Sequence, residues 1–311
     1  MREHVMKEAR WMAVGALSLL GFSAQAQPQS LLAPQDLEVG CDWILAYDST
    51  VPDRGNYAFP ETHARYWVAV VSDNVPVGAR LKIEGKFPDA RYSALHAHDG
   101  NLFVHDALSD NELVPDPGSV NPNLDRTRRD FGLPTGGSYT AYVDIGQDKP
   151  AVPAPNTLYR PKAALFDSKV SKRTALAYRT YLAEGENTGG VGLPKLTLIT
   201  PQGERSLSPA VDKPTCDAIQ AQLANTVVTL PVSLLQPLIP AAVPIFRKLD
   251  GALLNATGLG VGFNPHNGFL VAKTDRDYAD LVLVRGQMPT YTTQDPNTPL
   301  PQLRYWSLCQ S

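Results

Sequence analysis

Short segments in which apolar and polar residues alternate recur along most of the chain, and they constrain the fold more than any other feature. Between residues 138 and 146, Tyr139, Ala141, Val143 and Ile145 alternate with Thr140, Tyr142 and Asp144, as in a strand with one buried face. Comparable segments, bounded by Gly, Pro, Asn and Asp, occupy residues 66–72, 80–85, 91–98, 102–105, 138–146, 174–183, 195–200, 269–274, 280–285 and 303–309. The pattern predicts a mainly β fold, a large antiparallel, jelly-roll-like β-sandwich.

Prolines and glycines fall mostly between these segments. Proline cannot donate to a sheet ladder, so the Pro-rich stretches at residues 114–123, 148–156 and 293–302 are expected to be ordered loops at the ends of the sandwich. A single domain over residues 40–311 is expected, preceded by a flexible segment at 27–39.

One helical insertion interrupts the β pattern at about residues 214–256. Thr215 is a suitable N-cap for a helix over 216–227, but four prolines between Leu230 and Phe246 forbid one long helix. Two interpretations are open: short helices that cover an end of the sandwich, or a lid over an apolar ligand cavity. In either case we expect Leu230 to Phe246 to pack on the sandwich and not to enter a membrane.

The N-terminus has the three parts of a secretory signal peptide, over residues 1–26. Basic residues precede the apolar run Trp11 to Phe22, and small residues at Ala24 and Ala26 form a cleavage site. About 12 apolar residues are too few for a bilayer core that needs roughly 20. The sequence therefore predicts a secreted or periplasmic protein.

The mature chain is weakly acidic. Residues 1–26 hold three of the 28 basic and two of the 31 acidic side chains, which leaves 25 against 29, a net charge of -4. This balance gives no electrostatic reason to expect nucleic acid or an anionic membrane surface as a partner.

The three cysteines, Cys41, Cys216 and Cys309, show no CxxC or zinc-type spacing. In an oxidising compartment a disulfide is the expected use of two of them. Because Cys309 lies so near the end of the chain, we expect a bond between Cys41 and Cys216 and a free thiol at Cys309.

The segment 95–106, LHAHDGNLFVHD, contains the clearest candidate for a chemical site. If Asp99-Gly100 forms a two-residue hairpin turn, His96, His98 and His105 share one face and could bind a divalent metal, with Asp106 or Asp99 orienting a ring. With a three-residue loop, His105 turns to the other face. The alternative is a polar strand that faces solvent. The nucleophile-elbow, HExxH, Walker and dinucleotide motifs are missing from the sequence.

Aromatic residues in pairs are the second feature of interest. Tyr178, Tyr181 and Trp306 could form a platform for a flat ligand or a sugar, although large aromatic residues are also ordinary sandwich core. The leading expectation is an exported, non-catalytic binding protein for a small apolar or glycan-like molecule. The alternatives are a metal-dependent hydrolase or oxygenase that uses the three histidines, and an envelope structural protein. Whether the chain is an enzyme stays open at this stage.

Several motifs resemble those of a family of uncharacterised secreted bacterial proteins. The resemblance rests on Phe87-Pro-Asp-Ala-Arg-Tyr92, on Val114-Pro-Asp-Pro-Gly-Ser-Val-Asn-Pro122 and on Arg304-Tyr-Trp-Ser-Leu-Cys309. The order of elements is also similar to DUF1214-type β-sandwich proteins. Neither resemblance implies a reaction, and family members carry other residues where His96 and His98 stand here, so a metal site is not implied by the resemblance.

Overall fold

The structure is a computed structural model of the chain. It describes residues 41–48, 63–72, 75–124, 137–162, 173–184, 188–208, 214, 216–218, 246–248, 263–272, 281, 283–290 and 303–308. The predictions for the signal peptide, residues 27–39, most of 214–256 and Cys309 lie outside these residues. The assignment of residues 40–311 to one domain stays a prediction.

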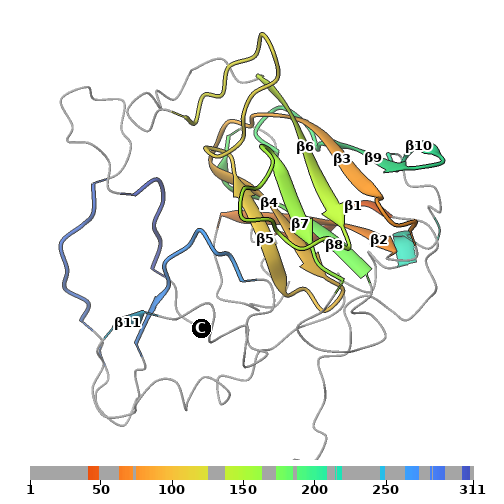
Figure 1. Ribbon diagram of the computed structural model, residues 1–311. Helices are drawn as coiled ribbons and strands as arrows, with labels where there is room; N and C mark the ends of the chain where they lie inside the picture. The colour runs from red at the N-terminus through yellow and green to blue at the C-terminus, as the bar shows by residue number, and fades with distance from the viewer. Residues whose placement is uncertain are drawn as a thin grey trace, which may run out of the picture.

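Two five-stranded sheets face each other, which confirms the predicted mainly β, sandwich-like fold (Figure 1). The first sheet has the order β1-β2-β8-β4-β5 and the second β10-β9-β3-β6-β7. The strands of the first sheet are β1 (Cys41–Asp48), β2 (Ala64–Ser72), β4 (Ala90–Asp99), β5 (Val104–Ser109) and β8 (Arg173–Ala183). Those of the second are β3 (Arg80–Lys86), β6 (Ser138–Ile145), β7 (Thr157–Arg160), β9 (Lys195–Thr200) and β10 (Gly203–Ser206).

The described strand pairs are antiparallel as predicted, except for β6 and β7, which pair in parallel. A separate two-stranded ladder joins β11 (Arg247–Lys248) to β12 (Leu270–Val271). Figure 1 shows the hairpin of β9 and β10 projecting beyond the sandwich, and β11 lying well away from it. Among the described residues, no helix is long and apolar enough to cross a membrane.

The main core lies between the two sheets. It contains side chains from alternate positions of β2, β4 and β8 on one side and of β3, β6 and β9 on the other. In β6 every second residue is buried, as the alternation predicted. The largest fully buried side chains of this core are Tyr139, Tyr178, Phe87, Leu81, Ile83, Leu95, Leu158, Leu176 and Leu196.

The first sheet is also buried on its other face, which we call the outer face. Strand β4 is buried at nearly every position and β8 at all but its last two, as expected of strands covered on both sides. Residues distant in sequence cover this face: Cys216, Asn264, His266, Arg304 and Tyr305 contact it. The outer face is therefore an interior surface.

The strand predictions were right for the central strands and wrong toward the C-terminus. The segments predicted at residues 66–72, 80–85, 91–98, 138–146, 174–183 and 195–200 match observed strands to within two residues. By contrast, the described residues of 280–285 are not in a strand, and the described residues of 303–309 have only a single bridge, at Leu303. Within 214–256, residues 214 and 216–218 are helical and β11 is extended.

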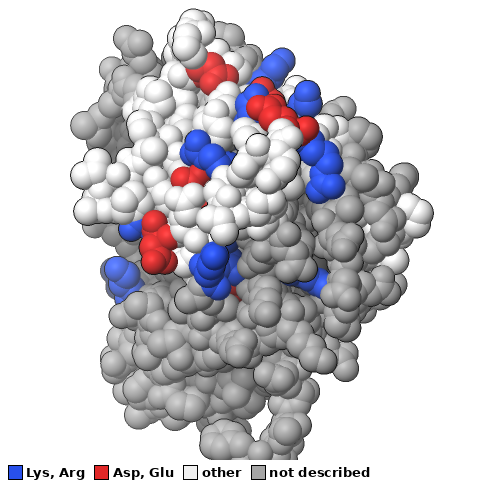
Figure 2. Space-filling view, turned by 45° about the vertical axis from the view of Figure 1, so that its right-hand side comes forward, with Lys and Arg blue, Asp and Glu red and all other residues white. Residues whose placement is uncertain are grey.

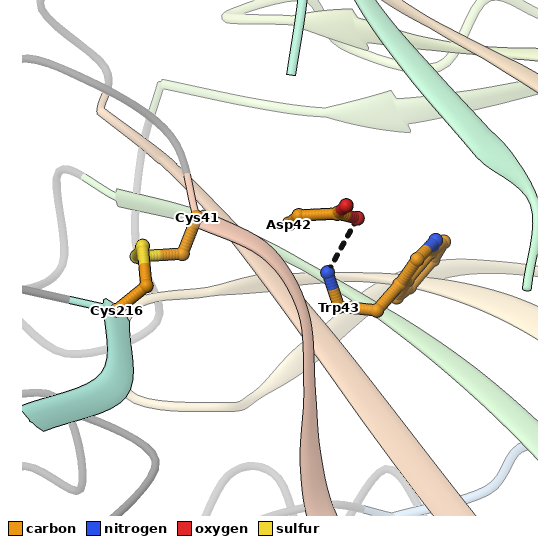
Figure 3. The surroundings of a disulfide bond; sticks show 4 residues. All are labelled: Cys41, Asp42, Trp43 and Cys216. Atoms are coloured by element: carbon orange, nitrogen blue, oxygen red, sulfur yellow. Dashed lines mark hydrogen bonds between the residues drawn. A yellow bond between two sulfur atoms is a disulfide. The ribbon is translucent and has the colours of Figure 1, made fainter. Parts of the chain in front are cut away.

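A disulfide joins Cys41 to Cys216, which confirms the predicted pair. Their Cα atoms are 5.6 Å apart and 175 positions separate them in the sequence. Figure 3 shows Cys41 where β1 begins, with the bond reaching to the helical turn that carries Cys216. Beside it, the indole Nε1 of Trp43 donates to the carbonyl of Pro194 at 2.5 Å, so the start of β1 is held at two points.

Candidate functional site

The turn between β4 and β5 has three residues, which is the case in which His105 was expected to turn to the other face. The backbone N–H of Asp99 donates to the carbonyl of Phe103 at 3.0 Å, which leaves Gly100, Asn101 and Leu102 in the loop. Leu102 adopts a φ of 66°, the left-handed conformation that a three-residue hairpin requires at its last position. The pairing then shifts between Ala97 and His98, so that the register moves from Asp106 to Val104.

This register removes His105 from the face that carries His96 and His98. The Nε2 atom of His105 lies 3.3 Å from Oδ2 of Asp99, and neighbouring residues of a strand point to opposite faces. Asp106 accepts hydrogen bonds from Lys149 Nζ and from the backbone of Tyr159, and orients no histidine. In the described part of the chain, no group of three or more His, Cys, Asp or Glu side chains could hold a metal together. The predicted three-histidine site is therefore not formed.

His96 and His98 remain together and are buried in the outer face. Their ring centroids are 5.8 Å apart, and their side chains are 0% and 1% exposed. The alternative of a solvent-facing polar strand is therefore wrong as well. The residues that flank them on β8 and β5 are small: Ala177 and Ala107 beside His96, Ala175 and Val104 beside His98.

Three ring nitrogens of this pair have no hydrogen-bond partner among the residues that the structure describes. The Nδ1 atom of His98 lies 2.9 Å from the carbonyl of Leu102, and because a carbonyl only accepts, Nδ1 carries the hydrogen and Nε2 a free lone pair. This Nε2 and both ring nitrogens of His96 are buried without a partner. Such groups cost stability in a folded protein and are uncommon, which makes them a sign of a ligand site.

Both rings are neutral near pH 7. Burial, with a smaller contribution from the nearby Arg179 guanidinium, lowers the pKa of His98 to about 3 and that of His96 well below 6.5. Neutral imidazoles are the form that binds metal ions.

His266 closes the outer face over His96. Its ring centroid is 5.7 Å from that of His96, in an edge-on arrangement. Both of its ring nitrogens are engaged, because Nε2 lies 3.1 Å from a carboxylate oxygen of Glu112 and Nδ1 2.9 Å from the hydroxyl of Tyr92. The hydrogen bond from His266 lowers the pKa of Glu112 to about 2. His266 is therefore a cover whose nitrogens are already in use.

Tyrosines and one arginine continue the outer face toward its other end. Tyr92 and Tyr181 pack at a centroid distance of 5.0 Å, the hydroxyls of Tyr66 and Tyr181 are 3.4 Å apart, and the Arg179 guanidinium lies 4.6 Å above the Tyr66 ring. The side-chain amides of Asn264 and Asn267 each donate to the Tyr181 hydroxyl. Burial raises the pKa of Tyr66 and of Tyr92, so both phenols stay protonated.

The predicted aromatic platform is not assembled. Tyr181 lies in the outer face, whereas Tyr178 points into the core between the sheets, since an odd number of strand positions separates them. Trp306 is 42% exposed and belongs to neither cluster. Tyr178, Tyr181 and Trp306 therefore share no common binding surface.

Sequence reasoning missed Tyr92, Arg179, Asn264 and His266. The alternation that links His96 to His98 extends to Tyr92, so this residue could have been found. Arg179 joins the face through the β4–β8 register, and Asn264 and His266 contact Tyr92 from 172 and 174 positions away. No local sequence pattern predicts either relation.

The described surface mixes charges of both signs. Arg80 pairs with Asp144 and Lys82 with Glu84, and Figure 2 shows basic and acidic side chains beside one another on one face of the molecule. The described basic residues on that face form no continuous surface for a nucleic acid, and the expectation of no such partner stays a prediction.

Comparison with known proteins adds little to this description. No protein-family profile matches the sequence, and no curated protein is significantly similar to it. The crystal structure of the VPA0106 protein from Vibrio parahaemolyticus aligns over 47% of this chain and 33% of its own, with 17% identity and a TM-score of 0.30. The alignment thus spans about a third of that protein's length.

Proposed function

We propose that this chain is an exported, non-catalytic binding protein that holds a transition-metal ion on His96 and His98. The observation that supports this most directly is the set of three buried ring nitrogens without a partner. A bound ion would accept the lone pairs of ring nitrogens that have no hydrogen-bond donor. The proposal keeps the predicted role of a binding protein and replaces the expected apolar or glycan-like ligand.

The state of the two rings suits an ion. A histidine that binds metal through one nitrogen usually donates the other N–H to a carbonyl or a carboxylate, as His98 does to Leu102. Neutral imidazole nitrogens bind zinc, copper, iron and nickel. Small residues flank both rings across β8 and β5, and binding requires the rings to turn so that a lone pair of each faces one ion.

Burial favours binding over turnover. A catalytic metal keeps an open position for substrate, whereas His266 and the segment around it lie over this pair. The glycan-like ligand has less geometric support, because Tyr178, Tyr181 and Trp306 lie apart. Export is supported by the Cys41–Cys216 disulfide, since such bonds persist in oxidising compartments.

Metal titration of the purified mature protein tests the proposal. We expect binding of one ion per chain, and loss of binding in His96→Phe, which keeps a flat ring and removes both nitrogens. The matched control is His63→Gln, because His63 is exposed and lies outside the outer face. Equal binding by the two variants, or no binding by the wild-type protein, would contradict the proposal.

A further inference from the structure

We propose that the ion held by His96 and His98 is monovalent copper. This inference rests on the proposed function and names the ion that the same site would take. It follows from the number of ligands, their charge and their burial.

Among the described residues, the site offers two neutral ligands and no anionic one. Carboxylates of the surrounding segments are engaged elsewhere: Glu112 with His266, Asp110 with Arg304, and Asp99 with His105 on the other face. Zinc takes four ligands in most protein sites, and divalent copper and nickel prefer a square-planar set. Two neutral nitrogens satisfy monovalent copper, a closed-shell ion that is stable with two ligands in a nearly linear arrangement.

The distance between the rings leaves one ion's span between them. Two imidazoles on opposite sides of one ion, each with a metal–nitrogen distance of about 2 Å, have centroids about 6 Å apart. The centroids of His96 and His98 are 5.8 Å apart and their planes are inclined by 25°, so the rings stand side by side and must rotate before a lone pair of each faces the ion.

Electrostatics opposes a second positive charge at this site. The cost of removing an ion from water grows with the square of its charge, and no ligand anion offsets that cost here.

The cover over the pair also suits monovalent copper, which is readily oxidised in water. His96 is fully buried, and the rings of His98 and His266 lie against it. Exclusion of solvent disfavours the divalent state, which would need further ligands.

Anaerobic competition against a chromophoric copper(I) chelator, with parallel titrations of zinc(II) and copper(II), tests this inference. We expect one copper(I) per chain, with tighter binding than either divalent ion, and X-ray absorption showing two nitrogen ligands. His96→Phe and His98→Phe should each lose copper(I). Circular dichroism would establish that each variant is folded.

The outcomes separate the two proposals. Zinc(II) or copper(II) binding tighter than copper(I), and lost in His96→Phe, would overturn the choice of ion and leave the metal-binding proposal standing. An X-ray absorption spectrum that shows four ligands around the ion would also overturn the choice of monovalent copper. Failure of the wild-type protein to bind any of the three ions would overturn both.

Discussion

The Nε2 atom of His105 lies 3.3 Å from Oδ2 of Asp99, on the side of the hairpin opposite to His98. The other carboxylate oxygen of Asp99 accepts the backbone N–H groups of Asn101 at 2.9 Å and Phe103 at 3.2 Å. Burial opposes the charged form of Asp99, but these hydrogen bonds outweigh it and lower the pKa of the carboxyl. One side chain thus holds the three-residue loop and fixes His105.

Asp99→Ala should lower the free energy of unfolding by about 2 kcal/mol, because two loop N–H groups and His105 lose their acceptor. Asp99→Asn keeps an oxygen for the N–H groups and should lose less. Urea unfolding of both variants measures the difference. Equal losses would show that the loop hydrogen bonds contribute nothing.

The contact between Glu112 and His266 should make the free energy of unfolding depend on pH. The folded-state pKa of Glu112, about 2, is below its ordinary value of 4.5, so its contribution is complete above pH 4.5 and is lost as the pH falls toward 2. Glu112→Gln should therefore be less stable than wild type at pH 6 and equal to it near pH 2. Thermal unfolding across this range measures the effect.

Glu204→Gln serves as the control, because Glu204 is exposed on β10. The stability difference between Glu204→Gln and wild type should not change with pH in the way expected for Glu112→Gln. A Glu112→Gln difference that stays constant from pH 6 to pH 2 would contradict the assignment to this contact.

Replacing His96 should stabilise the metal-free protein. His96→Phe removes two buried nitrogens without partners, and we expect a gain of about 1 kcal/mol in the free energy of unfolding. His98→Phe should gain less, because it also leaves the Leu102 carbonyl without the Nδ1–H donor. Chemical unfolding after treatment with a chelator compares the two. A loss of stability in His96→Phe would mean that its ring nitrogens are satisfied in the native protein.

Gly85 should tolerate no side chain. A Cβ atom at this position would lie 2.5 Å from atoms of the Tyr139 ring, which is buried and paired with Gly85 across β3 and β6. Gly85→Ala should cost about 2 kcal/mol, since the ring must shift within a packed core. Gly268→Ala is the matched control, because a Cβ there has no neighbour within 4 Å. Similar unfolding midpoints for the two variants would refute this packing argument.

Alternation of apolar and polar residues predicted the central strands because the burial of each face is reflected in the local sequence of the strand. It missed three strands of the two sheets. One is β1, and the others are β7, whose four residues are all buried, and β10, whose four residues are all exposed, so that neither of these two shows alternation. The hairpin was predicted from Asp99-Gly100, but the Asp99 side chain caps the loop N–H groups and the positive φ falls on Leu102. Local preference for a two-residue turn yielded to a side-chain hydrogen bond.

The site itself could be predicted only in part. His96 and His98 share a face by strand geometry alone, and this part of the prediction was correct. What covers them depends on His266, which bonds to Tyr92 across 174 positions. Contacts of that range are set by the packing of the whole chain and leave no pattern in either segment.

The Cys41–Cys216 bond changes how the molecule would respond to a pulling force. All ten strands of the two sheets lie between these residues in the sequence or begin at Cys41. Tension applied at the two ends of the chain would pass through the sulfur atoms and leave the sandwich outside the loaded path. The chain enclosed by the disulfide is 175 positions long, which corresponds to roughly 600 Å when fully extended. Reduction would release it, so an oxidised molecule should extend far less under load than a reduced one.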